Sequence, residues 1–246
     1  MTRFILLAHI IIFIASPWSF AQREEPERVE FFSQDGVSIR ASYYSSRQRY
    51  SPAVLLLPEF RQSRAFWDRA SAYLSDKGYA VLVIDFRGQG ESTQLGERSL
   101  DWAFFPNTYF KLFLLDINAS MNFLHFQPGV DQSRMAIMGA GLGANAALLF
   151  ASGDKRIEGL ILISPGLNYR GLEIEEAITK YGNRPILIIV SRDDCYSLYS
   201  SKRLYSLAKG RKELKIYPNA GRGAKMPKRR ADIMEFISQW LKELFD

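Results

Sequence analysis

Residues 138–147 read MGAGLGANAA and join an apolar, strand-like run to a helix of small residues. Glycine at positions 139, 141 and 143 permits a sharp turn in which the backbone comes close to its neighbours. In a turn of this kind, a serine at the centre stands above the edge of a parallel sheet and acts as a nucleophile. Here the central residue is Gly141, which has no side chain. The stretch therefore predicts an α/β fold whose nucleophile is missing.

Apolar runs of strand length recur along the chain. They are continuous rather than alternating, which favours strands buried on both faces of a parallel sheet. These runs are Ala53–Leu57, Ala80–Ile84, Met135–Met138, Leu160–Ile163 and Pro185–Val190, with Leu214–Tyr217 as a weaker, alternating edge strand. Ahead of them, Arg28–Phe32 and Val37–Tyr44 flank an Asp35-Gly36 turn, a pairing that predicts an N-terminal antiparallel hairpin.

Helical patterns occupy the stretches between these strands. The expected helices are Ala65–Asp76, Tyr109–Phe126, Leu142–Ala151, Ser200–Lys209 and Ala231–Leu244. Alternation of strands and helices with short connections predicts a doubly wound, mostly parallel sheet flanked by helices. Two irregular stretches, Leu95–Asn107 and Leu167–Gly182, either cap a pocket or pack on the surface. Because no linker interrupts the pattern, we expect residues 22–246 to form one domain.

Residues 1–21 have the features of a secretory signal peptide. Arg3 supplies the positive start, Phe4–Ala15 is apolar, and small residues occupy positions 19 and 21 before the expected cleavage site. The apolar stretch is shorter than the roughly 20 residues that cross a bilayer. We therefore expect export, to a periplasm or to the medium, with no transmembrane helix left after cleavage. An uncleaved membrane anchor is the alternative.

Composition limits the partners and cofactors. The net charge is +6 over 246 residues, and the basic residues form no helix or stripe of the kind that binds nucleic acid. The densest basic run, between Arg222 and Arg230, is either a solvated surface or a weak contact for an acidic envelope surface. Cys195 is the only cysteine, which rules out an internal disulfide. No spacing of metal ligands occurs, so we expect neither metal nor cofactor, and the partner is an unidentified small molecule or protein.

Five short motifs in a fixed order give the chain a resemblance to a known family. They are Pro58-Glu59-Phe60, residues 85–92 (DFRGQGES), the glycine turn Gly139–Gly143, residues 190–197 (VSRDDCYS) and residues 217–223 (YPNAGRG). In this order they resemble the α/β-hydrolase superfamily, in its dienelactone-hydrolase-like and exported esterase branch, over about residues 28–245. The resemblance implies the α/β-hydrolase fold, and it identifies the glycine turn as the family's nucleophile elbow.

The same resemblance shows that two of the three catalytic positions are substituted. Gly141 stands at the position of the nucleophilic serine, and Arg222 stands at that of the general-base histidine. Asp194 takes the position of the acid, with Asp193 as the alternative. Arginine cannot act as the base, because its side-chain pKa exceeds about 12. No intact catalytic set is therefore expected.

The resemblance also locates the oxyanion hole, whose amides belong to Leu142 and to the Glu59-Phe60 segment. A carboxylate at Glu59 would repel a developing oxyanion, which argues further against acyl transfer.

No other residue replaces the lost groups convincingly. His125 is the only histidine beyond residue 21, and it lies at the wrong end of a strand to reach the elbow. Cys195 follows a predicted strand but has no histidine to shuttle its proton. Serine without a base is a poor nucleophile, which applies to Ser92, Ser164 and Ser191. A carboxylate pair of Glu59 and Asp194 remains as an alternative for acid–base chemistry.

Two functions remain open at this point. The first is an exported, catalytically degenerate protein of the α/β-hydrolase fold with a binding or scaffolding role, and we favour it. The alternative is an ester or lactone hydrolase that uses a non-standard group such as Cys195. For the first, the former active site is either closed by an Asp194–Arg222 ion pair or open as an anion-binding pocket. That pocket would use Arg222 and the Leu142 amide at a helix N-terminus.

Overall fold

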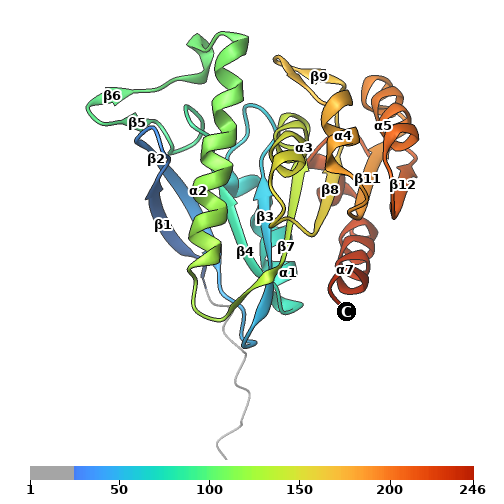
Figure 1. The fold of residues 1–246 in the computed structure, drawn as a ribbon, viewed down its shortest axis with the longest axis horizontal. Coiled ribbons are helices and arrows are strands. Elements are labelled where there is room, and N and C mark those ends of the chain that lie inside the picture. Colours follow the sequence, from blue (N-terminus) through green and yellow to red (C-terminus); the bar gives the residue numbers. More distant parts are fainter. Residues whose placement is uncertain (1–24) are drawn as a thin grey trace, which may run out of the picture.

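In the computed structural model, which describes residues 25–246, one large mixed sheet forms the centre of the protein (Figure 1). Its ten strands follow the order β12-β11-β8-β7-β3-β4-β2-β5-β6, with β1 paired to β2. Neighbours from β12 to β4 are parallel, whereas β2 pairs antiparallel with β1, β4 and β5. The predicted α/β architecture, with an antiparallel N-terminal hairpin, is confirmed. The predicted signal peptide, residues 1–21, lies outside the described residues.

The strands agree with the apolar runs of the sequence. The large sheet contains β1 Glu27–Phe32, β2 Val37–Tyr44, β3 Ser51–Leu57, β4 Ala80–Ile84, β5 Gln94–Leu95, β6 Arg98–Ser99, β7 Val130–Ala140, β8 Gly159–Ile163, β11 Ile186–Ser191 and β12 Lys212–Tyr217. A small separate sheet pairs β9 (Asn168–Tyr169) with β10 (Leu172–Glu173). The central strands are continuous in apolar character because successive side chains enter two different cores. Leu55 and Leu57 pack on one face, and Val54 and Leu56 on the other.

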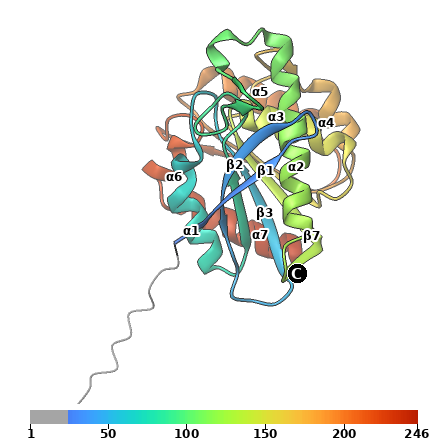
Figure 2. The same ribbon diagram turned by 90° about the vertical axis from the view of Figure 1, so that its left-hand side faces the viewer.

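Helices cover both faces of the sheet (Figures 1 and 2). They are α1 Asp68–Asp76, α2 Phe113–His125, α3 Leu142–Gly153, α4 Glu175–Tyr181, α5 Cys195–Leu207, α6 Lys225–Arg229 and α7 Asp232–Phe245, with 3₁₀ turns at Arg64–Trp67, Trp102–Phe104 and Asn107–Leu112. Side chains of α2, α3, α4 and α5 join one core, and those of α1, α6 and α7 join the other. No helix among residues 25–246 combines the length and the apolar character that a membrane span needs.

Two groups of helices differ from the expectation. α5 begins at Cys195, five residues before the predicted start at Ser200, because the Asp194 side chain accepts a hydrogen bond from the Ser197 amide and caps the helix. The first turn of α5 has Ser197 as its buried residue, so it shows no apolar periodicity. α4 and α6 are short helices that the sequence pattern did not indicate; α4 lies in the irregular stretch 167–182 and α6 in the basic run.

The DFRGQGES motif holds the loop after β4 through a buried ion network. The Arg87 guanidinium is fully buried and donates to two carboxylates, Asp116 on α2 and Asp35 in the β1–β2 turn, over 2.6–2.9 Å. Burial raises the pKa of Asp116 to about 6, although Arg87 opposes that rise. The motif thus ties the hairpin, the β4 loop and α2 together, and its role in this fold is structural.

Replacing Arg87 tests this network. Arg87→Leu leaves two carboxylates without their cation, one of them fully buried, and we expect a loss of about 3–5 kcal/mol in the free energy of unfolding. Arg134→Leu is the matched control, because it breaks a partly exposed pair with Asp131 and is expected to cost below about 1 kcal/mol. Urea denaturation measures both variants, and equal losses would contradict the assignment.

Candidate functional site

The elbow between β7 and α3 keeps its sharp geometry. Gly141 has φ 53° and ψ −117°, a backbone conformation that residues with a side chain adopt only with strain. Its amide donates to the Ile163 carbonyl at 2.9 Å, and α3 begins at the next residue. A Cβ atom at Gly143 would lie 2.5 Å from the Pro58 carbonyl oxygen, so α3 approaches the end of β3 closely. The turn therefore survives without the nucleophile.

The side chain of Glu59 fills the space in front of this turn. A Cβ atom built on Gly141 would lie 2.9 Å from Glu59 Cγ and 3.1 Å from Glu59 Oε1. A Cβ atom on Gly223 would overlap the Glu59 carboxylate from the other side. Only 18% of the Glu59 side-chain surface is exposed. A side chain at either position would thus require the partly buried Glu59 side chain to move.

Arg222 lies between two carboxylates. Its Nε atom is 3.4 Å from Glu59 Oε1 and 3.8 Å from Asp194 Oδ2. The guanidinium stands over the Tyr169 ring, 5.1 Å from its centroid, and about half of the side chain is exposed. The expected Asp194–Arg222 contact is present, but Glu59 is the nearer partner. We call these three residues the Glu59–Asp194–Arg222 cluster.

Burial dominates the electrostatics of Glu59. It raises the pKa of the Glu59 carboxyl above its ordinary value, and the nearby charge of Asp194 adds to that rise. Arg222, Lys225 and the Ala224 amide act in the opposite direction. Asp194 Oδ1 accepts from the Ser197 amide at 3.3 Å, whereas Asp194 Oδ2 is buried with no hydrogen-bond partner. The cluster thus holds two carboxylates and one half-exposed cation.

Buried serines at the strand ends position the loop that carries Arg222. Ser164 Oγ accepts from the Gly223 amide at 2.9 Å, and Ser191 Oγ accepts from the Ala220 amide at 2.8 Å. Ser92 Oγ accepts from the Arg40 amide and donates to the Asp85 carbonyl. All three hydroxyl-bearing residues are buried and engaged, so their roles are structural.

The remaining candidates lie away from the elbow or face elsewhere. His125 ends α2 near the start of β7, and β7 runs alongside β3 from Ser51 to Leu57, which places the start of the strand about 20 Å from the elbow. Cys195 is exposed at the first residue of α5. Asp193 is exposed and accepts from the Ser191 hydroxyl and the Gly221 amide, so Asp194 is the aspartate that faces Arg222. Within residues 25–246, no group of histidine, cysteine and acidic side chains is arranged to hold a metal ion.

The second irregular stretch of the sequence contacts the cluster, and the first contacts the neighbouring Phe60. Trp102, from the first, packs edge-on against Phe60 with 4.9 Å between ring centroids. Tyr169, from the second, underlies Arg222. Asn145 on α3 donates to the carbonyls of Gly166 and Leu172, both at 2.8 Å, and so fixes the β9–β10 hairpin to the elbow helix. The second stretch therefore packs against the cluster itself, whereas the first packs beside it.

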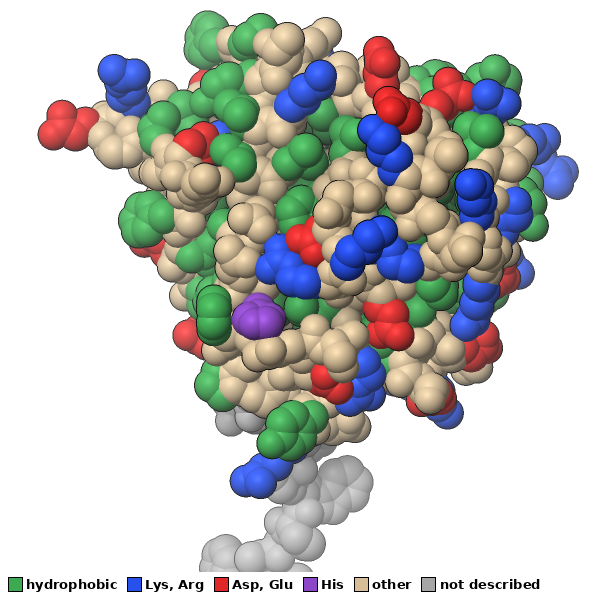
Figure 3. Space-filling model, viewed as in Figure 1, with side chains coloured by type: hydrophobic (Ala, Val, Ile, Leu, Met, Phe, Trp, Pro, Cys, Tyr) green, Lys and Arg blue, Asp and Glu red, His purple; other side chains and the backbone are tan. Residues whose placement is uncertain are grey.

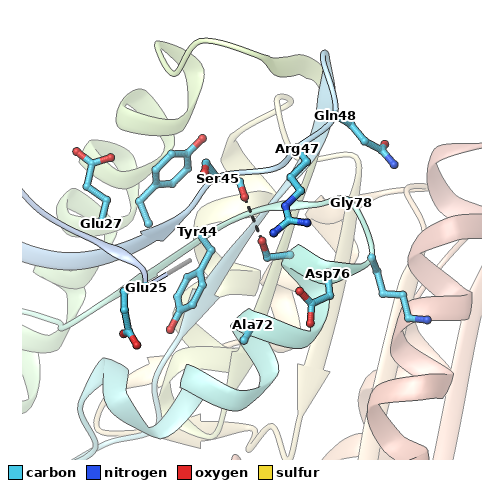
Figure 4. A pocket seen from close by; sticks show the side chains of 12 residues that line it. Glu25, Glu27, Tyr44, Ser45, Arg47, Gln48, Ala72, Asp76 and Gly78 are labelled. Carbon is cyan, nitrogen blue, oxygen red and sulfur yellow. Dashed lines mark hydrogen bonds between the residues drawn. The ribbon is translucent and has the colours of Figure 1, made fainter. Parts of the chain in front are cut away.

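A more open hollow lies at the opposite edge of the sheet (Figure 4). It has a volume of about 530 Å³ and is lined by polar groups that include Tyr44, Arg47 and Asp76. The Ser75 hydroxyl donates to the Ser45 carbonyl across it. Gly78 borders it just before β4 begins, which places it at the amino ends of the parallel strands. Ligands of open α/β sheets bind at the carboxyl ends, so this hollow is not the former active site.

The model of the dienelactone hydrolase family matches residues 39–239. The chain belongs to the dienelactone hydrolase family. Among curated relatives, thiohydrolase apmlB of Arthrinium phaeospermum is 29% identical over 140 residues, which cover 56% of this chain and 43% of the relative. Acyltransferase drtE of Aspergillus calidoustus is 29% identical over 161 residues, which cover 65% and 49%. The matched part of this chain thus spans slightly less than half the length of each of these two relatives.

The fold of this dienelactone hydrolase family member is shared with solved α/β hydrolases. The structure of the alpha/beta hydrolase GrgF from Penicillium sp. sh18 superposes with a TM-score of 0.73 at 16% identity. The match covers 89% of this chain and 97% of that one. At this identity the likeness concerns the fold alone.

The partly buried Glu59 predicts a defined pH dependence of stability. Because the folded pKa is raised, folded protein binds a proton at a pH at which the unfolded chain has released it. As pH falls from 7 through that pKa, the wild-type protein should gain stability relative to Glu59→Gln, which cannot take up the proton. Urea denaturation of both proteins at a series of pH values measures this difference.

Arg222→Gln provides the control for the cause of the shift. Without the cation that opposes the effect of burial, the pKa of Glu59 should rise further. As pH falls, the gain in stability of Arg222→Gln over the Glu59→Gln, Arg222→Gln double variant should then begin at a higher pH than the corresponding gain of the wild-type protein. A stability difference that is independent of pH in both backgrounds would show that Glu59 is solvated.

Proposed function

We propose that this protein is a non-hydrolytic member of its family, retained for a binding or scaffolding role. The observation that carries the proposal is the Glu59 side chain, which occupies the space that a nucleophile at position 141 would need. Around it, the turn at Gly141 keeps its sharp geometry and Asp194 faces Arg222, which supports the proposal. In this proposal the turn at Gly141 is retained, whereas the nucleophile and the general base are absent.

Each requirement of acyl transfer meets an obstacle in this cluster. Gly141 offers no nucleophile, and Arg222 cannot accept a proton. The Glu59 carboxylate lies beside the elbow amides, where it would oppose the negative charge of a tetrahedral intermediate. Loss of the nucleophile or base alone reduces turnover in serine hydrolases by roughly 10⁶-fold.

Of the two forms considered for the former active site, the contacts favour the closed one. Arg222 is already within 4 Å of both Glu59 and Asp194, and its guanidinium stacks on the Tyr169 ring. An added anion would have to approach past the Glu59 carboxylate. The proposal is therefore an ion cluster that seals the site, rather than an anion-binding pocket formed by Arg222 and the Leu142 amide.

A hydrolase with a non-standard catalytic group is the second candidate. It is favoured by the names of the curated relatives, which are a thiohydrolase and an acyltransferase, and by the pair of carboxylates at the elbow. A panel of p-nitrophenyl esters and thioesters separates the candidates. Turnover that follows the purified protein and is lost in Glu59→Gln or Cys195→Ala would establish the hydrolase.

We also propose that the protein acts outside the cytoplasm, in a periplasm or in the medium, on the strength of the signal features in residues 1–21. Cell fractionation followed by N-terminal sequencing tests this proposal. A mature N-terminus at Gln22 in the exported fraction supports it. Retention of the full chain in the membrane fraction would support the uncleaved anchor instead.

Restoring the catalytic groups tests the closed-site proposal. The triple variant Glu59→Gly, Gly141→Ser, Arg222→His should hydrolyse p-nitrophenyl acetate at least about 100-fold faster than wild type, a small fraction of a full triad's contribution. The double variant Gly141→Ser, Arg222→His keeps Glu59 and should stay inactive, because the Cβ atom of the new serine would collide with Glu59 Cγ. Equal activity of the double and triple variants would contradict the blocking role of Glu59.

A further inference from the structure

We propose that a small apolar cavity between α1, α6 and α7 binds a free alkyl carboxylate of short chain length. The cavity has a volume of about 200 Å³ and is bordered by Phe66 and Tyr73 on one side and by Pro227 and Met234 on the other. None of the residues that line it belongs to the Glu59–Asp194–Arg222 cluster. The proposal is therefore independent of the proposed function, and either can fail without the other.

The shape and chemistry of the wall indicate the tail of the ligand. Two aromatic rings, a proline and a methionine make most of the lining apolar, which suits a hydrocarbon chain. The volume is smaller than that of sites for drug-sized molecules, about 300–1,000 Å³. A single short chain fits these limits better than the two chains of a phospholipid.

The rim of the cavity indicates the charge of the head group. Arg69 and Lys228 both line it, and within residues 25–246 neither forms an ion pair with a carboxylate. The Lys228 ammonium stands 3.5 Å above the centroid of the Phe66 ring, which places it at the mouth of the apolar space. Glu235 is the acidic residue on the rim, and Asp68 lies close enough to Lys228 to feel its charge.

Two cations without an ion-pair partner, set beside an apolar space, favour an amphiphilic anion over a neutral or cationic one. The basic run of the sequence gains a role in this way, because Pro227 and Lys228 belong to it. On the face shown in Figure 3, acidic and basic side chains are interspersed. A carboxylate held by Arg69 and Lys228 completes the fit.

Octanoate is the probe for this site. Isothermal titration of the full chain with octanoate should give saturable binding at one site per molecule, and octanol and octyltrimethylammonium should bind more weakly. Lys228→Gln and Arg69→Gln should each weaken octanoate binding about threefold to tenfold, because each removes one partner of the head group. Lys242→Gln is the matched control, since it removes a cation from α7 that does not line this cavity.

A filled cavity provides the decisive comparison. Ala231 is exposed at the start of α7 and borders the cavity, so Ala231→Phe places a ring in it without entering the core. Octanoate binding should disappear in this variant, while its circular dichroism and melting temperature show that it is folded. Three results would overturn the proposal: no saturable octanoate binding, unchanged binding in folded Ala231→Phe, or association only with anionic phosphatidylglycerol vesicles.

Discussion

The buried carboxylate of Glu59, held between Gly141 and Gly223, is the constraint from which the rest of the site follows. A side chain at either glycine would collide with it. Its charge in a largely buried place requires a cation nearby, and Arg222 supplies one at 3.4 Å. A neutral histidine at position 222 would leave the carboxylate without that partner. The substitutions at 59, 141 and 222 are therefore physically coupled, and reversing one alone leaves a clash or an unpaired charge.

The frame around this cluster does not depend on catalytic groups. Arg87 joins the hairpin turn, the β4 loop and α2 through buried hydrogen bonds to Asp116 and a partly buried one to Asp35. Asn145 anchors the covering hairpin to α3, while Ser164 and Ser191 hold the Arg222 loop. Each of these contacts is satisfied within the protein and needs neither nucleophile nor base. The fold can therefore persist when catalysis is lost, and belonging to the family does not settle the activity.

Much of the fold could be read from the sequence because its signals are local. Continuous apolar runs such as Ala53–Leu57 mark strands that feed two cores, and Asp35-Gly36 marks the hairpin turn. The start of α5 could not be read from apolar periodicity, because it depends on the capping side chain of Asp194. The partnership of Glu59 with Arg222 was also missed, since it joins loops far apart in the chain. The glycine at position 223, which leaves room for the Glu59 carboxylate, is the local sequence feature that reflects this contact.

The position of Glu59 also changes what the elbow can do as a binding site. The N-terminus of α3 and the side chain of Arg222 both favour negative charge, which would ordinarily attract an anion from solution. Glu59 offers that charge from within the chain, at the high effective concentration of a tethered group. A free anion must therefore displace a covalently attached competitor and leave it buried without its cation. Recognition of small acids is for this reason better served by a surface at which the cations form no ion pair within residues 25–246, as at Arg69 and Lys228 beside the α1–α6–α7 cavity.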